Sequence, residues 1–139
     1  ARYLGRISGP LLDRIDMQLE VTAVPVRQIT ESAPEEPSSA IHARVQAARQ
    51  RQQERYAHEG VSSNAELSAR QLEQFCPLDD ACRDLIGKAC DKYNLSMRAV
   101  SRVRKVARTI ADLAGEEHIG KAHLLEALRY RNLEGSYWK

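Results

Sequence analysis

The chain has 139 residues, of which 42% are hydrophobic and 29% are charged, and its formal net charge is +2. This composition is typical of a globular protein and excludes an intrinsically disordered chain. Aromatic residues make up only 5%, so aliphatic and alanine side chains must fill the core, which favours packed helices. No window resembles a membrane-spanning helix, and the N-terminus does not have the pattern of a signal peptide.

The three cysteines, Cys76, Cys82 and Cys90, are odd in number and show no disulfide framework. This predicts a reducing compartment, and we expect a cytoplasmic location. The cysteines have no CxxC spacing and the four histidines have no HExxH spacing, so the sequence predicts no metal site.

Residues 15 to 21 alternate between apolar and polar side chains, which predicts a half-buried strand. A lone strand is not stable, so its sheet partners are expected to precede Ala1. The chain begins without a methionine, and we interpret it as a piece of a longer protein.

Residues 27 to 37 are polar and contain two prolines, which indicates a linker. A long helix is expected next, capped by Ser38 or Ser39 and ended by Gly60. Three of its arginines share one face and form a predicted nucleic-acid-binding surface: Arg44, Arg51 and Arg55. Whether this helix contacts DNA or a neighbouring subunit is left open by the sequence.

Four more helical patterns predict a compact bundle over residues 64 to 131. The fold class is therefore expected to be mainly α. The expected helices run from about Ser68 to Phe75, from Asp79 to Tyr93, from Ser96 to Gly115 and from Lys121 to about Arg131, with Asn94 as a C-terminal cap.

One phosphate-loop pattern is misleading. Gly115, Gly120 and Lys121 have the Gly-x-x-x-x-Gly-Lys spacing, but Ala122 replaces the Ser or Thr that would hold Mg²⁺. A helix precedes the pattern where a buried strand should be. Gly115 is better explained as a helix C-cap.

The helix that starts at Ser96 places Met97 and Arg98 in its first turn. A cation there opposes the helix dipole, at a cost of about 0.3–1 kcal/mol. A bound phosphate would remove the conflict, because free backbone N–H groups and the guanidinium would both point at it. The alternative is that Arg98 bends away to a surface carboxylate.

The remainder of that helix is basic, and Arg98, Arg102 and Lys105 share a face. The alternatives are a solvated face and a site for a polyanion, either nucleotide or nucleic acid. On the second interpretation the nucleotide-binding residues are Met97, Arg98 and Arg102. Arg108 and Asp112 are expected to form a weak pair one turn apart.

Arg14 lies at a turn that Pro10 sets up, at the start of the predicted strand and flanked by acids. It could form a local Arg–Asp ion pair that fixes the turn. It could also be presented to a neighbouring subunit, where an arginine neutralises charge on a transferring phosphoryl group.

Three blocks of this sequence resemble the C-terminal half of magnesium-chelatase-like AAA+ ATPases, and within them the ComM/YifB competence-protein family. The blocks are Ser8-Gly9-Pro10-Leu11-Leu12-Asp13-Arg14-Ile15-Asp16, Leu95-Ser96-Met97-Arg98-Ala99 continued by Lys105 to Leu113, and Glu126-Ala127-Leu128-Arg129-Tyr130-Arg131. Chelatase motor subunits tend to continue Phe-Gly after Arg14. The Ile15-Asp16 found here favours the ComM-like branch.

The resemblance implies site roles. Arg14 matches the arginine finger, which reaches ATP on the adjacent subunit in trans. Arg98 matches the sensor-2 arginine, which contacts the γ-phosphate of its own subunit's ATP in cis. The resemblance further implies a truncated strand-helix tail of the α/β ATPase core at 1–26, a linker and long basic helix at 27–63, and a helical lid at 64–139.

The resemblance also implies partners and cofactors. The Walker A and Walker B elements would precede Ala1, so this segment alone would be inactive and hold no cofactor, while the full-length ATPase would use ATP and Mg²⁺. The expected partners are its own N-terminal core, the neighbouring subunits of a homohexamer, and DNA, with no membrane. The implied activity is a branch-migration helicase in recombination and natural transformation.

Two other functions remain open on the sequence. One is the motor subunit of a magnesium or metal chelatase, with the same ATP mechanics. The other is a stand-alone helical nucleic-acid-binding module.

Overall fold

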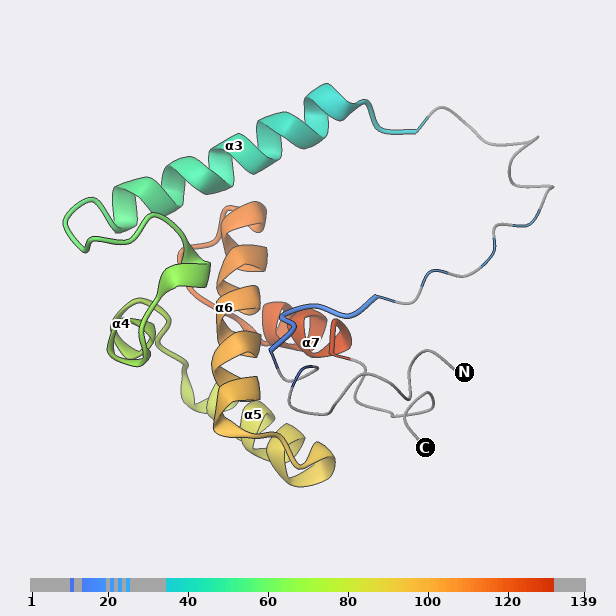
Figure 1. Ribbon diagram of the computed structural model, residues 1–139, viewed down its shortest axis with the longest axis vertical. Coiled ribbons are helices and arrows are strands. Elements are labelled where there is room, and N and C mark those ends of the chain that lie inside the picture. The colour runs from blue at the N-terminus through green and yellow to red at the C-terminus, as the bar shows by residue number, and fades with distance from the viewer. Residues whose placement is uncertain are drawn as a thin grey trace.

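The computed structural model describes residues 11, 14–19, 21, 23, 25 and 35–131. This part of the chain is helical, which confirms the predicted fold class (Figure 1). Its elements are α3 (Ser38–Arg55), the 3₁₀ helix η2 (Asn64–Glu66), α4 (Ala69–Phe75), α5 (Asp80–Tyr93), α6 (Met97–Ala114) and α7 (Lys121–Arg129). The predicted linker lies mostly outside the described residues, as does Pro10.

Helix α6 is the centre of the bundle. It contacts α3, η2, α4 and α7, and α7 also contacts α5. Figure 1 shows α6 as an upright rod with α3 crossing near its C-terminal end. Ala99, Ala107 and Ala111 are at most 1% exposed, and their small side chains let neighbouring elements approach α6 closely. The other core side chains come mainly from these neighbours: Tyr56, Leu67, Leu72, Cys76, Cys82, Ile119, Leu124, Ala127 and Leu128.

Local sequence signals set most helix ends. Ser68 forms a capping box with Gln71 at the start of α4, where this helix was expected to begin. Asn94 ends α5 with φ +50° and Gly115 ends α6 with φ +81°, so both predicted C-caps are confirmed. The left-handed backbone at these two positions is what stops each helix.

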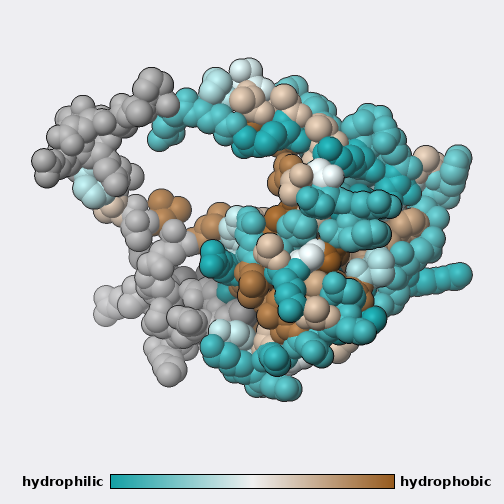
Figure 2. Space-filling model, turned by 180° about the vertical axis from the view of Figure 1, so that it is seen from behind, coloured by the Kyte–Doolittle hydropathy of each residue, from teal (hydrophilic) through white to brown (hydrophobic). Residues whose placement is uncertain are grey.

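Helix α3 differs from its predicted ends. Its N-cap is Pro37, which makes no side-chain cap hydrogen bond, and the helix ends at Arg55. Gly60, at φ +70°, lies in the turn that follows. Ile41 and Val45 are 44% and 39% exposed, so the N-terminal half projects beyond the bundle (Figure 1). The exposed side chains of α3 are mostly hydrophilic. In the view from behind, hydrophilic teal atoms predominate along the upper part of the molecule, where α3 lies (Figure 2).

The predicted strand at residues 15 to 21 is wrong. The described residues of this segment have no strand conformation, and its apolar side is exposed, from Ile15 at 38% to Val21 at 90%. The segment bonds to the end of α7 instead, through a 2.5 Å hydrogen bond from the Gln18 amide to the Tyr130 carbonyl. Alternation predicted a strand, but a strand forms only where a neighbouring strand supplies ladder hydrogen bonds, and the described residues supply none.

Candidate functional site

The N-terminus of α6 presents Arg98 to solvent. The Ser96 hydroxyl accepts a 3.1 Å hydrogen bond from the Ala99 amide and so caps the helix. Met97 is 77% exposed, and Arg98 is exposed beside it. No described carboxylate pairs with Arg98, so the alternative of an ion pair at this position is not found within the described residues. The helix start therefore keeps a free cation next to its remaining amides.

Arg14 lies in a turn closed by a 3.0 Å hydrogen bond from its own amide to the Leu11 carbonyl. Its side chain is exposed, and no described carboxylate pairs with it. The nearby Asp16 bonds instead to Arg102 of α6. Of the two acids that flank Arg14, Asp16 thus ties this turn to α6, and Asp13 lies outside the described residues.

The predicted basic face of α6 is largely occupied by protein partners. Arg102 holds Asp16, and its side chain is 26% exposed. The Lys105 ammonium donates a 2.9 Å hydrogen bond to the Ala65 carbonyl next to η2. Of the three cations predicted to share this face, only Arg98 has no hydrogen bond or ion pair to a described residue.

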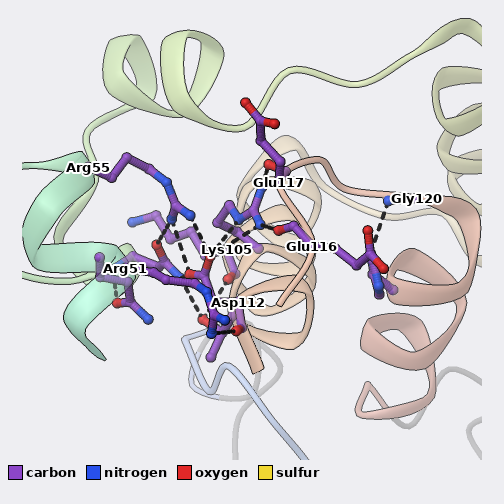
Figure 3. Close-up of polar contacts among 12 residues, drawn as sticks. Arg51, Arg55, Lys105, Asp112, Glu116, Glu117 and Gly120 are labelled. Atoms are coloured by element: carbon purple, nitrogen blue, oxygen red, sulfur yellow. Dashed lines mark hydrogen bonds and ion pairs between the residues drawn. The ribbon is translucent and has the colours of Figure 1, made fainter. Parts of the chain in front are cut away.

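The other end of α6 carries a buried ionic cluster centred on Asp112, whose side chain is 0% exposed. Its Oδ1 accepts hydrogen bonds of 2.5 Å from Arg55 Nη2 and 3.2 Å from Arg108 Nε. Its Oδ2 accepts hydrogen bonds of 3.1 Å from Arg55 Nη1 and 2.9 Å from Asn64 Nδ2. Figure 3 shows Arg55 reaching this carboxylate from α3. Four donor contacts satisfy the buried charge.

Asn64 extends this cluster into the turn between α3 and α4. Its side-chain oxygen accepts a 2.7 Å hydrogen bond from the Tyr56 hydroxyl. Its backbone amide donates a 3.0 Å hydrogen bond to the side-chain oxygen of Gln52. Its side-chain nitrogen also lies 3.0 Å from the Thr109 hydroxyl. Asn64 is 2% exposed, so its bonds to Tyr56 and Gln52 are buried, and its bond to Thr109 is partly buried.

Two arginines bind backbone carbonyls at and after the C-terminal end of α6. Arg51, labelled in Figure 3, donates to the Asp112 carbonyl in the last turn of the helix at 2.9 Å. A cation is favourable there because the last carbonyls of a helix lack helical partners. Arg108 donates to the carbonyls of Glu116 and Glu117, just beyond the helix, at 2.6 and 2.7 Å. Burial is the largest single influence on Arg55 and by itself would lower its pKa, but the hydrogen bonds and negative charge of Asp112 and Tyr56 together outweigh burial, so the pKa is raised.

The predicted nucleic-acid-binding face of α3 has protein partners at all three arginines. Arg44 pairs with Glu36, Arg51 caps α6, and Arg55 binds Asp112. Arg44 and Arg51 remain exposed, the Arg44 side chain at 54%, whereas the Arg55 side chain is 20% exposed. Nucleic-acid binding by these residues stays a prediction that their geometry does not favour.

Sequence reasoning undervalued Asp112 and missed Asn64 and Arg104. Asp112 is the first acid in a helix in which five basic residues precede it. A lone acid among so many cations was the signal in the sequence that Asp112 would form ion pairs. Arg104 is 9% exposed and donates to the carbonyls of Leu72 and Cys76 at 3.2 and 2.8 Å, which caps α4. These contacts span 28 or more residues, so helical spacing could not reveal them.

Among the described residues, no group of three or more His, Cys, Asp or Glu side chains could hold a metal ion. None of the described helices combines the length and the apolarity needed to cross a bilayer.

The family comparisons bear on both ends of the chain. The family described as "Magnesium chelatase, subunit ChlI C-terminal" matches residues 35–131, and that described as "Magnesium chelatase, subunit ChlI" matches residues 1–29. The chain belongs to the magnesium chelatase ChlI family. Within this family the chain is ComM/YifB-like, because it is similar over most of its length to proteins with those names.

Three relatives illustrate the similarity. The chelatase-family chain is 41% identical to the competence protein ComM of Haemophilus influenzae, over 94% of the chain and 25% of that relative. It is 39% identical to the protein YifB of Escherichia coli, over 96% of the chain and 26% of that relative. It is 35% identical to the protein Rv2897c of Mycobacterium tuberculosis, over 94% and 26%. The chain thus spans about a quarter of the length of the relatives it matches.

Proposed function

We propose that this chain is the C-terminal part of a ComM/YifB-like AAA+ ATPase and supplies two arginines to ATP hydrolysis. Arg14 is the arginine finger for the adjacent subunit's ATP, and Arg98 is the sensor-2 arginine for its own subunit's ATP. The observation that carries the proposal is the exposed Arg98 in the first turn of α6, with no described carboxylate to neutralise it.

The chemistry of phosphoryl transfer explains why two such arginines are needed. Negative charge on the γ-phosphate must be neutralised where water is excluded, and a planar guanidinium binds phosphate oxygens in pairs. At Arg98 the amides of the first helical turn add further donors toward an anion. The remaining elements of the site, including the phosphate loop and the Mg²⁺ ligands, would come from the ATPase core of the full-length protein.

The proposal extends to what the ATPase drives. One relative is named a competence protein, which supports DNA remodelling during natural transformation or recombination as the output. On this proposal the full-length protein is a homohexamer that uses ATP and Mg²⁺ and moves DNA branch points in the cytoplasm. The mostly hydrophilic, projecting half of α3 (Figure 2) is available for a contact with DNA or a neighbouring subunit.

The first experiment measures ATP turnover in the full-length protein with Arg14→Ala or Arg98→Ala. Each variant should lose about 100-fold or more in kcat, because an arginine finger contributes on the order of 10³ or more and a single transition-state donor about 10². Arg83→Ala is the control, because this exposed arginine of α5 pairs only with Asp80 among the described residues. Normal turnover in either test variant would remove the role assigned to that arginine.

A mixing experiment tests the assignment of one arginine in trans and the other in cis. In oligomers that contain both Arg14→Ala and Arg98→Ala subunits, an Arg14→Ala subunit followed by an Arg98→Ala subunit forms one complete site. Turnover should therefore exceed that of either variant alone. No recovery would show that both arginines of one subunit act on the same nucleotide.

A second candidate is a chelatase motor, which the family description itself favours. Its ATP mechanics would be the same, so the two arginine variants cannot separate the candidates. Branched or single-stranded DNA added to the full-length protein should raise ATP turnover if DNA is the substrate. Stimulation by a porphyrin and Mg²⁺, with no response to DNA, would favour the chelatase.

A further inference from the structure

We infer that Asp16 and Arg102 are positioning residues that fasten the Arg14 turn to the helix that carries Arg98. The sequence predicts that Arg102 binds nucleotide, but the guanidinium of Arg102 binds the Asp16 carboxylate. The inference rests on the proposed function of Arg14 and Arg98. It adds that the two arginines are mechanically coupled within one chain.

The Asp16–Arg102 ion pair lies close to both Arg14 and Arg98 along the chain. Arg102 lies four residues after Arg98 in α6, so the two share a face about 6 Å apart along the axis. Asp16 lies two residues after Arg14, which is at most about 7 Å of extended chain. A single ion pair therefore joins the close neighbourhoods of the two proposed phosphate-contacting groups.

The segment around Arg14 depends on few contacts. It has no strand partner among the described residues, and two of its backbone groups bond to residues at the end of α7. The Gln18 amide donates to the Tyr130 carbonyl at 2.5 Å, and the Ile15 carbonyl accepts from Arg131 Nη1 at 3.5 Å. Of the side chains of residues 14–19, only that of Asp16 makes a hydrogen bond to another described residue. Within the described part of the chain, its carboxylate is therefore the one side-chain connection from this segment to α6.

The environment of Arg102 suits a positioning role better than a ligand role. Its side chain is only 26% exposed, and its Nε is buried without a hydrogen-bond partner. Of its two terminal nitrogens, Nη1 binds the Asp16 carboxylate. Asp16 is 49% exposed, so the contact lies at the surface, where it can be broken without opening the core.

The arrangement gives the pair a consequence for neighbouring sites. When Arg98 closes on the nucleotide of its own subunit, α6 moves with it, and Asp16 transmits that movement to the Arg14 turn. The position of the finger offered to the adjacent subunit then depends on the state of the first site. Exposed ion pairs contribute little to stability, so the loss of this pair should change turnover more than folding.

The test uses the full-length protein with Asp16→Asn, Arg102→Gln and the charge-reversed pair Asp16→Arg with Arg102→Asp. Each single variant should lower kcat about tenfold, a typical coupling for a contacting pair, and leave the KM for ATP within about twofold. The melting temperature should stay unchanged. The reversed pair and Asp16→Glu should recover most of the lost kcat. Asp80→Asn, in the exposed Asp80–Arg83 pair of α5, is the matched control.

The outcomes separate this inference from the proposed function. If Arg14→Ala abolishes turnover but the Asp16 and Arg102 variants turn over normally, the coupling is wrong and the proposed function stands. If Arg14→Ala has normal turnover, the proposed function fails first. A raised KM at unchanged kcat in Arg102→Gln would make Arg102 a nucleotide ligand and overturn the inference, as would a kcat loss that neither reversal nor Asp16→Glu restores.

Discussion

Arg55 of α3 and Asp112 of α6 are 57 residues apart in the sequence and form a two-pronged ion pair, with N–O distances of 3.1 and 2.5 Å. The aspartate is fully buried, and the Arg55 side chain is 20% exposed. Since α3 buries only Ala48 and Gln52, this pair and the Asn64 bonds beside it are the main polar attachment of the long helix. The Asp112 carboxylate is thus the main ionic anchor of α3, and the bonds from Arg51 to the Asp112 carbonyl and from the Asn64 amide to Gln52 support it.

Removal of that carboxylate should strongly destabilise the protein. Asp112→Ala leaves Arg108, at 2% exposure, and the partly buried Arg55 without their counter-charge. We expect a loss of about 3–5 kcal/mol in the free energy of unfolding, measured by urea denaturation. Asp80→Asn should change it by less than about 0.5 kcal/mol, because Asp80 is 99% exposed. Equal effects of the two substitutions would show that the Asp112 cluster is not structural.

The glycine that ends α6 offers a second test. Gly115 has φ +81°, and an added Cβ would lie 3.3 Å from Arg51 Nη2. Gly115→Ala should therefore cost about 1–2 kcal/mol through the left-handed backbone. Gly87 lies in α5 with nothing within 4 Å of a built Cβ, so Gly87→Ala should stabilise by about 0.5–1 kcal/mol. In thermal unfolding, Gly115→Ala should lower the melting temperature and Gly87→Ala should raise it. A change in the same direction for both variants would contradict the conformational explanation.

The cap of α6 can be tested at one hydroxyl. Ser96→Ala removes the acceptor of the Ala99 amide and should cost about 1 kcal/mol. Ser96→Asp should keep most of the stability, because a carboxylate accepts the same bond and favours the helix dipole. Ser101→Ala on the same helix removes only a 3.0 Å bond to the Met97 carbonyl and should have little effect. Chemical denaturation that ranks Ser101→Ala as the most harmful would refute this order.

The cysteines should differ in reactivity. Burial raises the pKa of Cys76 and of Cys82 to about 11, and both thiols are 0% exposed. Burial also raises the pKa of Cys90, but this residue is only partly buried. Because the thiolate is the reactive form, alkylation at pH 8 should modify Cys90 first and the other two only on unfolding. Mass spectrometry of a labelling time course measures the order.

A pH series sharpens the same measurement. Below its pKa, the thiolate fraction of Cys90 rises about tenfold per pH unit, so its labelling should accelerate on going from pH 7 to pH 9. Cys76 and Cys82 should stay protected over this range, since access also limits them. Rapid native-state labelling of all three would show that the bundle is more open than its contacts indicate.

Much of the bundle was predictable because its signals are local. Each of these signals depends on residues within about one helical turn. They are the capping box at Ser68, the left-handed residues Asn94 and Gly115, and the helical spacing of apolar positions in α6. The exposed place of Arg98 follows in the same way, since a helix start beside Ser96 dictates which side chains lie in its first turn. The resemblance to the chelatase-like family rested on such short blocks too.

Local signals in the sequence were enough to place most of the helix ends, those of α3 excepted, and to put Arg98 at an open helix start. The folded chain was needed to reveal the partners of Asp112 and Arg102, the bonds of Arg51 and Arg55 to α6, and the lack of strand conformation in the described part of residues 15 to 21. The physical reason is that helix ends depend on backbone bonds over three or four residues. Ion pairs and strand ladders depend instead on groups that the chain brings together from 57 to 86 positions away.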